Sequence, residues 1–72
     1  MTKTEQPYTR VVRGLRTVKG MSQSRLAQLS GVSVRTVRAI EAEGTNPRAG
    51  VLLRILDALD ASEGDRARAM GA

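Results

Sequence analysis

Two arginines three residues apart, Arg35 and Arg38, carry the side chains of this 72-residue sequence best suited to recognise a polyanion. Guanidinium groups form bidentate hydrogen bonds with phosphate oxygens and with the O6 and N7 atoms of guanine. At about 100° per residue, a helix that turns Val37 and Ile40 inward presents the opposite face to solvent. That face combines two long cationic side chains with two alanines: Arg35, Arg38, Ala39 and Ala42.

Such a face suits the major groove of DNA, because it reaches base edges and has little bulk where the helix backbone approaches. Arg35 is the best candidate for a contact with guanine, and Val34 for a contact with a thymine methyl group. The residues expected to read bases are Val34, Arg35, Arg38 and Ala39. The alternative is a solvated surface on which arginine serves helix propensity alone.

Two serines are expected to open the helices that position this face. Each is preceded by an apolar residue and followed four positions later by another, as in a hydrophobic staple around an N-cap. The two sets are Met21, Ser22 and Leu26, then Val32, Ser33 and Val37. The serines are 11 residues apart across a break at Gly31, and this spacing predicts two short helices joined by a tight turn, the helix-turn-helix arrangement.

Phosphate contacts are expected at helix N-termini, where free backbone N–H groups and the helix dipole attract an anion. Ser22, Gln23 and Ser24 begin one helix, Ser33 begins the next, and Arg48 begins a later one. The expected phosphate contacts are Ser22, Gln23, Ser33, Thr36, Asn46 and Arg48. For each serine, capping without any phosphate contact remains the alternative.

The rest of the chain also follows helical periodicity. A first helix opens at Pro7 or Thr9 and ends at Gly20, with an apolar face formed by Val11, Val12, Leu15 and Val18. Gly14 should cost it about 1 kcal/mol relative to Ala, unless another helix packs closely there. The third helix is predicted from about Val34 to Glu43, ended by Gly44.

A fourth helix carries an apolar face formed by Ala49, Leu52, Ile55, Leu56 and Leu59. Ser62 and Asp65 cap a short final turn, and both chain ends are expected to be mobile. The predicted fold is therefore all-α, a compact bundle of four to five short helices.

Composition excludes several other classes of protein. The chain has no Cys and no His, so it lacks thiolate metal sites and the commonest general base. Ser22, Ser24 and Ser33 consequently lack an activating base, and Asp57 and Asp60 have no evident cleft partner, so we expect no enzyme. With a single aromatic residue, Tyr8, there is no stacking platform for RNA bases.

Neither a membrane span nor a signal peptide is evident, so a cytoplasmic location is expected.

The net charge is +5, and it is unevenly distributed. Residues 1–54 hold ten Lys/Arg against three Asp/Glu, whereas residues 55–72 hold two against four. Ten of the twelve basic residues are arginines, and a basic surface of this kind attracts polyanions.

Residues from about Val11 to Leu59 resemble the Cro/C1-type helix-turn-helix family, also known as the xenobiotic-response-element type. The matching residues are Leu15-Arg16, Met21-Ser22-Gln23, Leu26-Ala27, Gly31-Val32-Ser33, Val37, Ile40-Glu41, Gly44, Asn46-Pro47, Leu52 and Leu59. The resemblance implies a lambda-repressor-like domain of five helices that reads DNA with its third helix and usually binds as a dimer. It also implies a partly buried ion pair between Arg16 and Glu41. One departure is that Gly44 follows Glu41 by three residues, where relatives have two.

Three segments are expected: a flexible arm at 1–8, a DNA-binding domain at 9–60 with its helix-turn-helix at about 22–41, and a short helix or tail at 61–72. The last segment, with Leu53 and Leu56, is a candidate dimer contact. We therefore expect a bacterial or phage transcriptional regulator, a repressor more than an activator. It would bind double-stranded DNA as a homodimer on a palindromic operator. No cofactor or metal is expected. The alternative is an antitoxin or another module that binds a protein partner, such as a toxin, through its helical bundle.

Overall fold

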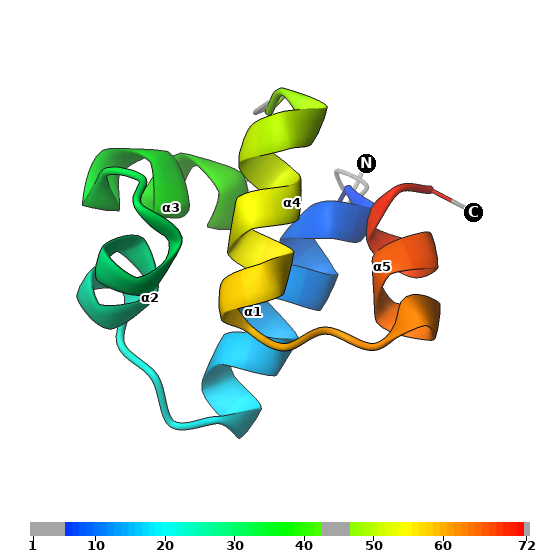
Figure 1. The fold of residues 1–72 in the computed structure, drawn as a ribbon, viewed down its shortest axis with the longest axis horizontal. Helices are drawn as coiled ribbons and strands as arrows, with labels where there is room; N and C mark the ends of the chain where they lie inside the picture. The colour runs from blue at the N-terminus through cyan, green and yellow to red at the C-terminus, as the bar shows by residue number, and fades with distance from the viewer. Residues whose placement is uncertain (1–5, 43–46, 72) are drawn as a thin grey trace, which may run out of the picture.

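The computed structural model describes residues 6–42 and 47–71, and all regular structure in them is helical (Figure 1). The helices are α1 (Pro7–Val18), α2 (Gln23–Ser30), α3 (Val34–Glu41), α4 (Ala49–Ala58) and α5 (Glu63–Ala69). The predicted all-α class is confirmed. Pro7 and Tyr8 belong to α1, so the arm expected at 1–8 extends two residues too far.

Helix α1 packs against three of the other four helices that the structure describes. It packs against α3, α4 and α5, and α2 packs against α3 and α4. In Figure 1, α1 runs behind α4, with α2 and α3 to one side and α5 to the other. The largest fully buried side chains between them are Thr9, Val12, Leu26, Val37, Ile40, Ile55, Leu56 and Leu59.

Helix α1 begins at Pro7, whose fixed φ suits the first helical position. It ends at Val18, shortly before the predicted stop Gly20, whose φ of +65° lets the Met21 N–H donate to the Arg16 carbonyl at 3.0 Å. Val18 is 85% exposed, so its expected place on the apolar face is wrong. It is the last helical residue, beyond the reach of the packed helices.

Nothing lies within 4 Å of a Cβ built on Gly14, so no close helix contact offsets the helical cost of this glycine.

Both predicted serine caps are present. The Ser22 hydroxyl accepts a hydrogen bond from the Arg25 backbone N–H at 2.9 Å, and the Ser33 hydroxyl accepts one from the Thr36 N–H at 3.0 Å. Between them, Gly31 takes a φ of +73° and ends α2. These local bonds form the tight turn between α2 and α3.

Helix α3 ends at Glu41, two residues before the predicted Glu43, because Ala42 adopts an extended conformation. The Ile40 carbonyl at this end accepts a hydrogen bond from the buried Thr9 hydroxyl at 2.7 Å. A side chain from α1 thus satisfies a carbonyl that a longer helix would have satisfied with its own backbone. Glu43 and Gly44, on which the predicted end depended, lie outside the described residues.

The second half of the chain differs from the prediction at Leu56 and Ala49. Leu56 is fully buried, so it belongs to the core and is not available as a dimer contact. Ala49 is exposed in the first turn of α4, where the chain has not yet reached the core. Ser62 and Asp65 form the expected capping box of α5, and this helix continues to Ala69, which is 2% exposed. Packing of α5 against α1 orders a segment whose own apolar pattern is weak.

Candidate functional site

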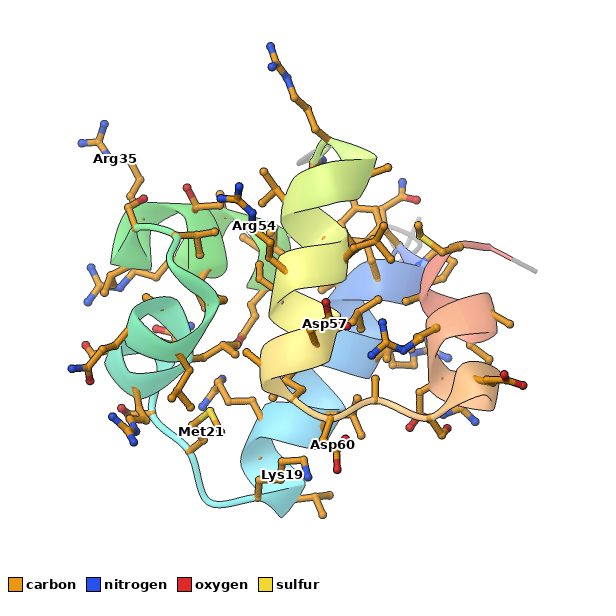
Figure 2. The ribbon with its side chains drawn as sticks, viewed as in Figure 1. Lys19, Met21, Arg35, Arg54, Asp57 and Asp60 are labelled. Atoms are coloured by element: carbon orange, nitrogen blue, oxygen red, sulfur yellow. The ribbon has the colours of Figure 1, made fainter. Side chains whose placement is uncertain are left out.

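Helix α3 presents the face that its sequence predicted. Val37 and Ile40 are fully buried, whereas Arg35 and Arg38 are exposed. Figure 2 shows Arg35 extending away from the body of the molecule. Val34 and Ala39 are half-buried at the edges of this face. The four expected base-reading residues therefore lie on one helix of eight residues, with both long side chains turned outward.

In the described part of the chain, the two guanidinium groups of α3 have no partner. Within residues 6–42 and 47–71, neither Arg35 nor Arg38 forms a hydrogen bond or an ion pair, and the same is true of the exposed Arg48 at the N-cap of α4. An unpaired guanidinium keeps all its N–H donors in water, so an anionic ligand can engage them without first breaking an internal ion pair. These side chains are chemically suited to phosphate and guanine.

The expected ion pair between Arg16 and Glu41 is present and bidentate. Arg16 Nε donates to Glu41 Oε2 at 2.6 Å, and Arg16 Nη2 donates to Glu41 Oε1 at 2.8 Å. The side chains are 18% and 5% exposed, respectively. The hydrogen bond to Glu41 raises the pKa of the Arg16 guanidinium, against the opposing effect of burial, so this residue stays charged.

Arg16 also connects the ion pair to the start of α2. Its Nη1 donates to the Met21 carbonyl at 2.8 Å, immediately before the Ser22 cap. Gln23, the first residue of α2, donates from Nε2 to Glu41 Oε1 at 3.2 Å. The network thus joins the end of α1, the N-terminus of α2 and the C-terminus of α3.

Gln23, an expected phosphate contact, is therefore half-buried and held by Glu41. Its amide nitrogen carries two hydrogens, and the bond to Glu41 uses one. Because Arg16 neutralises Glu41, the carboxylate next to this amide adds little repulsion toward an approaching anion. The interaction fixes the orientation of the Gln23 amide and leaves one N–H available to a ligand.

The other expected phosphate contacts lie at the N-termini of different helices. Ser33 and Thr36 lie together at the start of α3, where their hydroxyl oxygens are 2.9 Å apart. Ser22 caps α2 and is exposed. Asn46, like Thr45, lies outside the described residues.

Two arginines of α5 are paired with carboxylates. Arg66 of α5 pairs with Asp57 of α4 at 2.7 Å, and Arg68 pairs with Asp65 within α5. Among the described residues, the arginines with neither a hydrogen bond nor an ion pair are Arg35, Arg38, Arg48 and Arg54. No group of three potential metal ligands occurs among the described residues, and none of their helices is long and apolar enough to cross a bilayer.

Two residues that matter here were not singled out correctly from the sequence. Thr9 was read only as a possible helix start, but it is buried and donates to α3. A polar residue within the apolar segment of α1 was the available signal. Arg54 lies on the outer face of α4, and its place among the apolar residues Leu52, Leu53 and Ile55 was the signal there.

Comparison with known protein families gives one result. The model of a family described as Helix-turn-helix matches residues 12–65, which include the caps of α2 and α3, the ion pair and the exposed arginines. A comparison with curated proteins gives no match.

Proposed function

The chain belongs to the Cro/C1-type helix-turn-helix family of DNA-binding transcription regulators, and on this basis we propose that it is a sequence-specific repressor that binds a palindromic operator as a homodimer. In this proposal α3 enters the major groove. The observation that carries the proposal is the pair of exposed, unpartnered arginines on α3, above the buried Val37 and Ile40.

The residues divide into two roles. Arg35 and Arg38 contact base edges, with Val34 and Ala39 providing small apolar contacts at the sides of the same helix. The N-termini of α2, α3 and α4 approach phosphates through Gln23, Ser33 and Arg48, which set the register on the duplex without carrying sequence information. The activity is binding alone: the Ser22 and Ser33 hydroxyls serve as helix caps rather than as nucleophiles.

A dimer follows from the small size of the reading surface. One helix of eight residues contacts few base pairs, and two copies related by a two-fold axis double this number. Half-sites are then separated by about 34 Å, or one turn of the duplex. A repressor role is the simplest consequence, because a dimer bound across an operator blocks access to that DNA.

Selection of bound fragments from random duplex DNA tests the proposal. We expect an enriched palindrome with half-sites about one helical turn apart. Equal recovery of all duplexes would contradict sequence-specific recognition. The alternative function is to hold a partner protein. A protein of that kind would remain functional when Arg35 and Arg38 are both replaced by Gln. A reporter assay with that double variant therefore separates the two roles.

A further inference from the structure

Arg54 is an exposed cation in the middle of α4 that the proposed function leaves unused. In the part of the chain that the structure describes, it forms no hydrogen bond and no ion pair. The arginines of α5 differ, since Arg66 and Arg68 are both paired with carboxylates. Arg54 therefore resembles Arg35, Arg38 and Arg48, which are also unpaired, and differs from the paired Arg66 and Arg68.

The position of Arg54 on α4 explains this difference. The helix buries Leu52, Ile55 and Leu56, so the side chain between them must point outward. Figure 2 shows Arg54 extending from α4 to the side on which α3 lies. Asp57, three residues later, pairs instead with Arg66 on α5. The outer surface of α4 is thereby divided into a free cation facing α3 and a neutralised carboxylate facing α5.

We propose that Arg54 binds a phosphate of the DNA strand that flanks α3, and this inference rests on the proposed function. Arg54 lies six residues after Arg48, which is about 9 Å along the helix at 1.5 Å per residue. The phosphate contacts of α4 then extend beyond its N-terminus to its second turn. Because phosphates carry no sequence information, Arg54 raises affinity equally for all duplexes.

The test compares two variants that lose the same charge. Arg54→Gln removes the proposed contact, and Lys19→Gln removes another exposed, unpartnered cation at the far end of α1. Figure 2 shows Lys19 well away from Arg35. Binding to a short fluorescent duplex of mixed sequence is measured by anisotropy between about 50 and about 200 mM salt.

For Arg54→Gln we expect the slope of log K against log salt to decrease in magnitude by about 0.9, the value for one lost phosphate contact. Lys19→Gln should leave the slope unchanged, and Arg54→Lys should restore it. Equal slopes for Arg54→Gln and Lys19→Gln would overturn the role of Arg54 while leaving the proposed function intact. Absence of duplex binding by the unmodified protein would overturn both.

Discussion

The role of each arginine in this protein depends on whether a carboxylate lies within its reach. Arg16 is held by Glu41 and the Met21 carbonyl, and it organises the junction of three helices. Arg35 has no such partner and extends into solvent. The same side chain is therefore structural in one place and available to a ligand in the other, and substitutions at the two positions should affect different measurements.

Replacement of Arg35 by Ala should weaken binding to the selected operator by about 1–3 kcal/mol and relax the preference at one base pair, because a bidentate contact with a base is lost. Stability should change little, since the side chain is exposed and unpaired. Binding to a panel of single-base operator variants is the measurement, and Lys19→Ala is the matched loss of charge. An unchanged base preference would show that another residue reads that position.

Replacement of Glu41 by Ala should lower the free energy of unfolding by about 3 kcal/mol, because Arg16 remains in a mostly buried site without its counter-charge. Combining Arg16→Met with Glu41→Leu removes both charges and should be less destabilising than Glu41→Ala alone. Urea denaturation of the three proteins measures the effect. A double variant that is as unstable as Glu41→Ala, or less stable, would argue against the stranded cation as the cause.

At the scale of helices, starts and ends have different origins. The starts of α2, α3 and α5 each depend on a serine that bonds to a backbone N–H three residues later, so they are encoded locally. The end of α3 depends on Thr9, which is 31 residues away in sequence. This is why the starts could be predicted to the residue, whereas the end of α3 could not.

The contact between Thr9 and α3 can be tested with two substitutions. Thr9→Val keeps the shape of the side chain but removes the donor to the Ile40 carbonyl, so it should cost about 1–3 kcal/mol of stability. Thr9→Ser keeps the hydroxyl and loses one methyl group, at a cost of about 1 kcal/mol. Thermal and urea unfolding compare them. If Thr9→Val were as stable as the unmodified protein, the hydrogen bond would not determine where α3 ends.

Two glycines of the first helical segment should respond oppositely to the same substitution. Gly14 lies inside α1 with open space at its Cβ position, so Gly14→Ala should stabilise the protein by about 1 kcal/mol. Gly20 has a φ of +65°, where a Cβ is strained, so Gly20→Ala should destabilise it by about 1 kcal/mol. Midpoints of denaturant unfolding provide the comparison, and shifts of equal sign would contradict the assigned backbone conformations.

At the scale of the whole molecule, charge is separated across the fold. Among the described residues, the arginines without a hydrogen bond or ion pair lie on α3 and at the N-cap and middle of α4, whereas Arg66 and Arg68 are paired on the α4–α5 side. We expect this asymmetry to orient the molecule toward a polyanion. For the proposed dimer contact, Leu53, which is 40% exposed on α4, and the segment 61–72 remain candidates now that Leu56 has proved to be core.

The dimer contact can therefore be tested separately from the core. Leu53→Asp should shift the protein toward monomer and weaken operator binding while leaving the fold intact, because the side chain is already partly in water. Leu56→Asp should unfold it, since a charge would enter a fully buried site. Analytical ultracentrifugation and circular dichroism distinguish these effects. A Leu53→Asp protein that stays dimeric would place the interface elsewhere.

The sequence by itself determined the all-α class, the caps of α2 and α3 and the face that α3 buries, because capping and helical periodicity involve residues within one or two turns of one another. Only the tertiary structure decided where α3 ends, that Leu56 is core while Val18 is exposed, and that Gln23 is held by Glu41. Each of these depends on which distant segments are brought into contact; Arg16 and Glu41, for example, are 25 residues apart. Spacing along the chain carries no information about such contacts, and the ion pair was expected only from the family resemblance.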